Sequence, residues 1–224
     1  MKALTDRFEL AISGGDLARS PLLNVCVTAW GELPDAMPRG LRRGVAREGD
    51  VVFLIGNAGL ARLGLTILEE TKSAEEALAA AERWPAACAQ HLRPMPLAFE
   101  GMELGRFAVE HGLQDRVGLA RDLPRLLDSR KSGLGADIRL HADHIHAEVL
   151  RYCSKNGMDA ASFAFMGGED YSLAATCPAD AWPELEILLA SFSVPCLRLG
   201  TVRRGPVTLN GKAPDAAGFD HFSA

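Results

Sequence analysis

The sequence predicts an α+β protein whose helices and strands alternate along the chain and pack in layers. Residues 50–56 form a short apolar run rich in β-branched side chains, which is typical of a buried strand. Residues 74–90 are rich in alanine and glutamate, which favours a helix. The chain has 224 residues and is 48% hydrophobic, so it can bury a sizeable core. We expect helices to cover one face of a mixed sheet.

The beginning of the chain is expected to belong to an N-terminal unit. Residues 4–11 have the pattern of the end of a helix, and the apolar, β-branched run 22–30 predicts a buried strand. Such a strand needs partners, so we expect its edge to be covered by dimerisation or by new packing. Pro34, Pro38 and Gly40 then mark a connection to a second unit.

The second unit contains alternating elements that end at glycine, proline or polar turns. The strand predicted over residues 50–56 leads through a glycine turn into a helix over residues 58–70. Pro94 and Pro96 end the helix over 74–90. Leucines at helical spacing predict another helix over 118–130. The remaining expected elements are strands over 137–140, 171–176 and 196–202, helices over 146–155 and 179–191, and a hairpin turn at Asn210-Gly211.

Composition and charge exclude several classes of protein. The net charge of −5 provides no general attraction to nucleic acid. No apolar run approaches the roughly 20 residues needed to cross a bilayer, and the first residues do not resemble a signal peptide. The five cysteines contain no C-x-x-C pair and indicate neither a disulfide framework nor a zinc site. We therefore expect a cytoplasmic protein that binds neither nucleic acid nor membrane.

Two motifs place a carboxylate directly behind paired glycines. They are Gly14-Gly15-Asp16 and Gly167-Gly168-Glu169-Asp170-Tyr171. Paired glycines accept positive φ and let the backbone approach a ligand, while the adjacent carboxylate can hold a Mg²⁺ beside phosphate oxygens. Because such a triplet is also a common turn, each motif alone leaves both interpretations open.

The sequence around these motifs resembles that of the thiamine-monophosphate kinases, which belong to the superfamily that includes aminoimidazole ribonucleotide synthetase. The matching segments keep the order of the family and cover residues 12–16, 25–32, 41–43, 48–52, 132–136, 167–171 and 218–222. The resemblance implies a partial N-terminal domain for dimerisation and ATP binding over residues 1–32. It implies a larger C-terminal α/β domain of the aminoimidazole ribonucleotide synthetase type over residues 39–224. The family's first hundred or so residues have no counterpart in this sequence.

The resemblance implies transfer of the γ-phosphate of ATP to thiamine monophosphate, giving thiamine diphosphate, in a homodimer that uses Mg²⁺. By position, Gly15 would meet the nucleotide phosphates and Asp16 would bind Mg²⁺. Arg43 would approach the nucleotide. Arg42 or Arg47 would approach the nucleotide instead if the alignment with the family is shifted.

Two further residues match positions that contact the substrate in the family. Glu169 corresponds to a residue that meets the aminopyrimidine of thiamine monophosphate, and Phe219 corresponds to an aromatic residue that stacks on it. Each has a structural alternative. Glu169 would be a turn carboxylate, and Phe219 would anchor the C-terminus in the core.

One family motif is altered in this chain. The family carries Asp-x-Ser-Asp-Gly-Leu, whereas residues 114–119 here read Gln-Asp-Arg-Val-Gly-Leu. Both expected carboxylates are replaced. Asp115 lies one place away and is a weak candidate for a metal ligand. Arg116 brings positive charge where metal is expected, and an arginine cannot bridge phosphates in the geometry of a metal.

These departures leave two hypotheses for the function and a third, weaker one. The first is a truncated or divergent thiamine-monophosphate kinase, completed by another chain. The second is a non-catalytic module that binds a nucleotide or thiamine phosphate or serves in assembly. The third is a small-molecule synthetase of the same superfamily, which the Gly-Gly-Glu-Asp-Tyr motif and the C-terminal Gly-Phe-Asp-His-Phe favour less than the kinase.

A cluster of histidines also invites a metal interpretation. His141, Asp143, His144 and His146 lie within six residues and could ligate zinc or nickel. Their spacing is poor for that purpose, because His144 and His146 diverge if a helix begins there. A solvated loop that caps the helix is the favoured interpretation.

Overall fold

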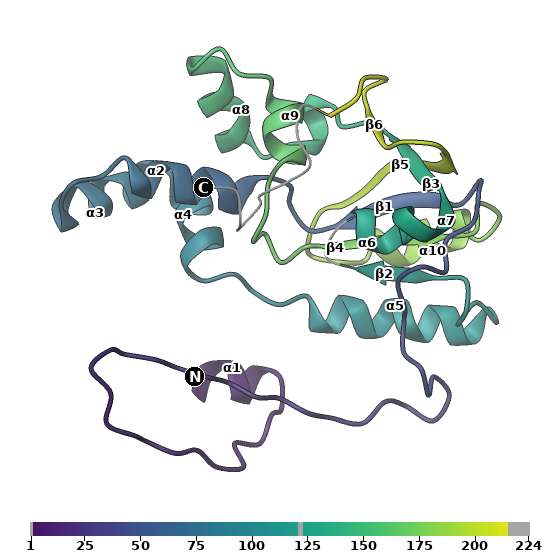
Figure 1. Ribbon diagram of the computed structural model, residues 1–224, viewed down its shortest axis with the longest axis horizontal. Helices are drawn as coiled ribbons and strands as arrows, with labels where there is room; N and C mark the ends of the chain where they lie inside the picture. The colour runs from purple at the N-terminus through teal and green to yellow at the C-terminus, as the bar shows by residue number, and fades with distance from the viewer. Residues whose placement is uncertain (1, 121–122, 215–224) are drawn as a thin grey trace.

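The computed structural model describes residues 2–120 and 123–214 and consists of a layered α/β domain and an extended N-terminal segment (Figure 1). The strands are β1 (Val51–Ile55), β2 (Gly118–Ala120), β3 (Leu134–Ile138), β4 (Leu173–Cys177), β5 (Cys196–Arg204) and β6 (Thr208–Leu209). They form one six-stranded sheet in the order β2-β4-β1-β5-β3-β6. Only the β3–β6 pairing is parallel among these neighbours, so the sheet is mixed as predicted.

The helices lie between these strands and at the N-terminus. They are α1 (Lys2–Arg7), α2 (Leu60–Glu69), α3 (Ala74–Arg83), α4 (Pro85–Leu92), α5 (Ala98–Glu110), α6 (Leu123–Leu127), α7 (Ser129–Ser132), α8 (Ala147–Lys155), α9 (Ala160–Phe165) and α10 (Trp182–Leu189). A 3₁₀ turn, η1 (Ala142–His144), precedes α8. Within the described ranges, no helix has the length and apolar character needed to cross a membrane.

Helices cover both faces of the sheet, so the prediction of one covered face is wrong. Successive side chains of a strand point to opposite faces, and β1 is apolar on both sides. Val52 belongs to a core cluster with side chains of α2, α4, α8 and α9. Val51, Phe53 and Ile55 belong to a second cluster with side chains of α5 and α10. The Phe53 ring, for example, lies 5.5 Å from the Trp182 ring.

The central strands and the helices α2, α8 and α10 agree with the sequence prediction, but the helix expected over 74–90 is two helices. The break falls at Trp84, whose φ of −129° and ψ of 57° are not helical. Pro85 follows it and begins α4. A proline disfavours the helical conformation of the residue before it and suits the first turn of a helix.

Residues 118–120 form strand β2 and not the start of the predicted helix over 118–130. Leu119 pairs with Ala175 of β4, and the helix α6 begins only afterwards. A Cβ on Gly118 would lie 2.6 Å from the Thr176 hydroxyl oxygen, so this glycine permits close contact between the two strands. The leucine spacing alone did not separate a short strand from the helix that follows it.

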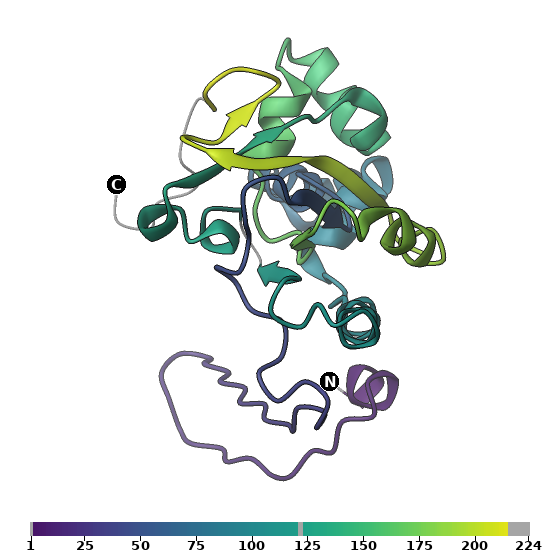
Figure 2. The same ribbon diagram turned by 90° about the vertical axis from the view of Figure 1, so that its right-hand side faces the viewer.

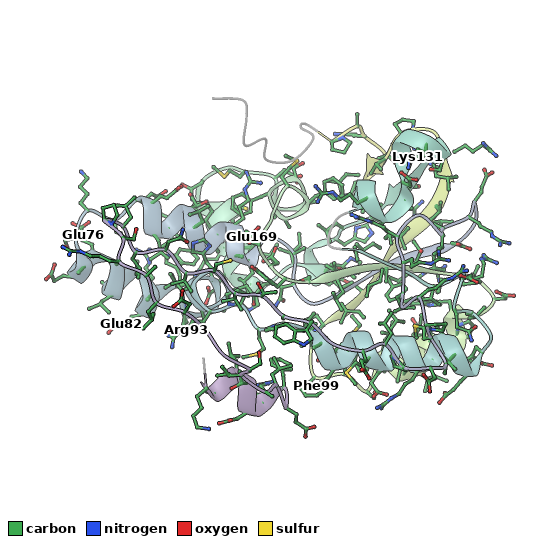
Figure 3. The ribbon with its side chains drawn as sticks, turned by 60° about the horizontal axis from the view of Figure 1, so that its bottom comes forward. Glu76, Glu82, Arg93, Phe99, Lys131 and Glu169 are labelled. Carbon is green, nitrogen blue, oxygen red and sulfur yellow. The ribbon has the colours of Figure 1, made fainter. Side chains whose placement is uncertain are left out.

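Residues 9–36, which we call the N-terminal arm, contain no strand, so the strand predicted over 22–30 is wrong for the single chain. The arm runs outside the layered domain in both views (Figures 1 and 2). A strand needs a neighbour to receive its backbone hydrogen bonds, and no strand among the described residues pairs with the arm. Phe8, which follows α1, contacts the domain, because its ring stacks 5.4 Å from that of Phe99 in α5. Figure 3 shows Phe99 beside the N-terminal helix.

The five cysteines are free thiols. Cys88, Cys153 and Cys177 are buried, whereas Cys26 in the N-terminal arm is exposed. Burial raises the pKa of Cys177 to about 12 and the pKa of Cys196 to about 11. Since the thiolate is the reactive form, these two thiols are inert at neutral pH.

Candidate functional site

The second glycine motif lies in a loop that is bound to the first turn of the domain. We call residues 166–172, between α9 and β4, the Gly167 loop, and residues 56–59 the β1–α2 turn. Ile55 at the end of β1 pairs with Leu173 at the start of β4, so the sheet register brings the turn and the loop together. The Ser172 hydroxyl donates a hydrogen bond to the Asn57 carbonyl oxygen at 2.7 Å.

Asp170 is the residue of the motif that turns inward. Its carboxylate accepts hydrogen bonds from the backbone N–H groups of Gly59 at 2.7 Å and Ala61 at 2.6 Å, so it caps the N-terminus of α2. Burial raises the pKa of Asp170, while the backbone N–H groups of Ala61, Gly59 and Leu60 act in the opposite direction. The Gln90 side chain donates to the Asp170 carbonyl oxygen at 2.6 Å. The loop is therefore held by α2 and α4 together.

Glycines allow the loop to approach the turn closely. A Cβ on Gly167 would lie 2.7 Å from the Gly59 Cα atom, and a Cβ on Gly59 would lie 2.5 Å from the Ala164 Cα atom. Gly59 also has a φ of 76°, in the left-handed region that favours glycine. Gly168, in contrast, has open space around the position of a Cβ. Gly167 thus permits close packing of the loop against the turn, whereas Gly168 borders open space.

Glu169 and Tyr171, on either side of Asp170, are exposed and adopt left-handed backbone conformations. Their φ angles are 62° and 56°. Such a conformation costs a non-glycine residue roughly 1–2 kcal/mol. Asp170 is bound to the domain, whereas Glu169, labelled in Figure 3, is exposed. Glu169 is therefore accessible from solvent.

The first glycine motif lies elsewhere, in the N-terminal arm. Asp16 is exposed, and its carboxylate accepts a hydrogen bond from the N–H of Leu17 at 2.8 Å. Gly14 and Gly15 have no atom within 4 Å of the position of a Cβ. Within the part of the chain that the structure describes, no hydrogen bond or ion pair joins Asp16 to Glu169. The two views place the arm apart from the layered domain, so one chain does not bring the two motifs together (Figures 1 and 2).

Arg42, rather than Arg43, is fixed to the domain. Its backbone pairs with β2, because the Leu119 N–H donates to its carbonyl oxygen at 3.2 Å. Its guanidinium forms an exposed ion pair with Asp115. Arg43 is exposed. Because Asp115 is engaged by a cation, its assignment as a metal ligand gains no support from the structure.

Arg116 forms an ion pair that the sequence analysis missed. It donates to a carboxylate oxygen of Asp50 at 2.7 Å, and the other oxygen accepts from the N–H of Arg47 at 2.8 Å. The Asp50 side chain is only 3% exposed and that of Arg116 is 26% exposed. The arginine that the altered motif carries at its third position thus neutralises a buried acid.

A metal site is not formed by the described residues. Among residues 2–120 and 123–214, no group of three or more His, Cys, Asp or Glu side chains could hold a metal ion. In the histidine cluster, His146 caps α8, because its ring accepts from the N–H of Glu148 at 3.2 Å. The interpretation of this cluster as a helix-capping loop is confirmed. Phe219, the other predicted substrate contact, lies outside the described residues.

Comparison with known proteins identifies relatives that are named thiamine-monophosphate kinase. No protein-family model matches the chain. The thiamine-monophosphate kinase of Haemophilus influenzae is 30% identical over 228 residues, which cover 96% of this chain and 65% of the relative. That of Escherichia coli K12 is 29% identical over 233 residues, which cover 98% of this chain and 66% of the relative. The chain thus spans about two thirds of the length of these relatives.

Solved structures give the same result for the fold. Thiamine-monophosphate kinase from Stenotrophomonas maltophilia K279a matches with a TM-score of 0.59 and 24% identity, over 77% of this chain and 54% of that one. AaThiL complexed with AMPPCP and TMP matches with a TM-score of 0.55 and 26% identity, over 83% of this chain and 55% of that one. E. coli HypE, a hydrogenase maturation protein, shares the fold at 17% identity and a TM-score of 0.52, over 82% of this chain and 54% of that one. The resemblance and the fold type expected from the sequence are confirmed.

Proposed function

Because this chain is homologous to the thiamine-monophosphate kinases, we propose that it binds ATP and thiamine monophosphate and transfers the γ-phosphate between them, giving thiamine diphosphate. The observation that carries the proposal is 30% identity to a named kinase over 96% of the chain. The AaThiL complex with AMPPCP and TMP supports both ligands. AMPPCP has a methylene group in place of the oxygen that joins the β and γ phosphorus atoms of ATP.

In this proposal, Glu169 and Phe219 bind the substrate. A carboxylate accepts hydrogen bonds, so Glu169 can accept one from the amino group of the aminopyrimidine. Its exposure, and the open space beside Gly168, support access of a ligand to it. Phe219 would stack on the same ring. The bound pyrimidine would then lie on the outer side of the Gly167 loop.

The nucleotide is assigned to Gly15, Asp16 and Arg43. Two phosphate groups repel each other, so their approach requires cations close by. Arg43 is exposed and can provide one positive charge. A Mg²⁺ site is not gathered within the described part of one chain, because Asp115 is paired with Arg42 and Asp16 stands apart from other acids. We assign no catalytic step to Mg²⁺ for this reason.

We also propose that the chain forms a homodimer. The N-terminal arm exposes many large apolar side chains, which favours their burial by a second copy. The most exposed include Leu17, Leu22, Leu23, Val25, Val27 and Trp30. Sedimentation velocity at micromolar concentration should give a dimer, and Leu23→Ser with Val25→Ser should weaken it. A native protein that stays monomeric would contradict this proposal.

Turnover tests the proposed reaction directly. Native protein incubated with ATP, Mg²⁺ and thiamine monophosphate should yield thiamine diphosphate, measured by chromatography. Asp16→Asn should lower the rate about 100-fold or more, because it removes the carboxylate that would hold a cation beside the phosphates. Asp35→Asn changes an exposed carboxylate of the same arm and should leave the rate unchanged. Equal rates for the two variants would remove Asp16 from the site.

A second candidate function, a non-catalytic module, is favoured by the arginines at the altered motif. Arg42 and Arg116 are paired with Asp115 and Asp50, so two acids near the expected metal position are already neutralised. Such a protein would bind thiamine monophosphate without phosphorylating it. Binding by calorimetry together with no product in the assay above would select this function.

A further inference from the structure

We propose that Asp170 is a positioning residue for the substrate, which acts by fixing the Gly167 loop so that Glu169 faces the ligand. The inference rests on the proposed function, because it assigns thiamine monophosphate to Glu169. It adds that Asp170, which faces the opposite way from Glu169, determines how tightly the substrate is bound.

The contacts of Asp170 explain how the loop is fixed. The carboxylate accepts from the N–H of Gly59 in the β1–α2 turn at 2.7 Å and from the N–H of Ala61 in the first turn of α2 at 2.6 Å, and it is mostly shielded from solvent. Its carbonyl oxygen accepts from the Gln90 side chain of α4 at 2.6 Å. One residue is therefore tied to two helices, through its side chain and through its backbone.

These contacts also maintain the unusual backbone on each side. Glu169 and Tyr171 both lie in the left-handed region, which a free loop of L-residues rarely populates. Such conformations persist where the surrounding structure determines them. If the bonds of Asp170 are lost, the loop can relax to ordinary φ angles, and the Glu169 side chain then changes direction. A ligand group displaced by 1 Å costs about 100-fold in a positioned reaction.

The test is the isosteric variant Asp170→Asn in the full chain, with thiamine monophosphate as the probe. An asparagine amide retains one acceptor oxygen but presents N–H₂ to the other backbone donor. We expect the KM and the calorimetric Kd for thiamine monophosphate to rise about tenfold or more, while the KM for ATP changes less than about twofold. Gln90→Met removes the hydrogen bond to the Asp170 carbonyl oxygen without changing a residue of the loop. It should raise the KM and the Kd for thiamine monophosphate by a smaller factor.

Asp159→Asn is the matched control. Asp159 also caps a helix, accepting from the Ser162 N–H at 2.8 Å at the start of α9. The Asp159→Asn variant should lower the temperature of unfolding, as Asp170→Asn does, and should leave the KM for thiamine monophosphate unchanged. A purely structural role predicts the same result for both aspartates.

The outcomes separate this inference from the proposed function. If the native protein binds thiamine monophosphate and Asp170→Asn binds it equally well, the inference is overturned while the function stands. If Asp170→Asn does not fold, an unchanged KM and Kd in Gln90→Met overturns the inference in the same way. If the native protein binds no thiamine monophosphate, the proposed function fails, and the inference fails with it. A selective loss of substrate binding in both variants supports the inference.

Discussion

Replacing Arg116 with methionine should lower the free energy of unfolding by about 3 kcal/mol, because it leaves the buried Asp50 carboxylate without its cation. The Asp50 side chain is 3% exposed and, among the described residues, keeps the hydrogen bond from the Arg47 N–H as its remaining one. The loss of a charged partner in such surroundings costs far more than the loss of an exposed pair. Urea unfolding followed by circular dichroism measures the difference.

The chain offers a matched control for this prediction. Arg42→Met breaks an ion pair with Asp115 in which the side chains are 42% and 71% exposed, so it should cost less than about 1 kcal/mol. The double variant Arg116→Met with Asp50→Asn should be more stable than Arg116→Met alone, because the buried charge is gone. Equal stabilities of the Arg116 and Arg42 single variants would show that burial does not strengthen the first pair.

Replacing Gly64 with alanine should destabilise the protein by about 2–3 kcal/mol, although alanine is the better helix former. Gly64 lies on α2 where it crosses α4. A Cβ there would lie 2.2 Å from the Ala87 carbonyl oxygen and 2.7 Å from the His91 Cβ atom. The backbone of α4 cannot yield without moving the helix, so the two helices must separate. The same urea titration measures the effect.

Gly101→Ala is the control, since Gly101 also lies within a helix, α5. A Cβ at that position meets only the Leu173 side chain at 3.7 Å, which is an ordinary contact. Helix propensity should therefore dominate and stabilise the protein by up to about 1 kcal/mol. A Gly64→Ala variant that is also stabilised would contradict the close crossing of α2 and α4.

Local patterns of the sequence predicted the elements whose causes are local. The Asn210-Gly211 turn is an example, since both residues have positive φ, 50° and 79°, and the Leu209 N–H donates to the Lys212 carbonyl at 2.8 Å. The helix α5 was not predicted. Its two glycines weaken the helical pattern, and one of them, Gly105, lies close to the side chain of Met37, from a distant part of the chain.

The candidate site could be predicted only in part, for a physical reason. The motif Gly-Gly-Glu-Asp-Tyr marked the Gly167 loop correctly, but the pattern does not say which acid faces inward. That choice follows from the pairing of β1 with β4 and from two N–H groups at the N-terminus of α2, those of Ala61 and of the capping residue Gly59, which lie 109 and 111 positions away in the chain. Likewise, no local feature paired Arg116 with Asp50, which are 66 positions apart.

The edges of the sheet have a consequence for how this protein can associate. Its two outermost strands are short, with three residues in β2 and two in β6. So short a border offers little backbone to a foreign strand, and open-ended stacking of sheets into fibrils is thereby discouraged. Exposed large apolar side chains are instead concentrated in the N-terminal arm. The homodimer proposed above, formed through the arm, would be a finite, closed assembly.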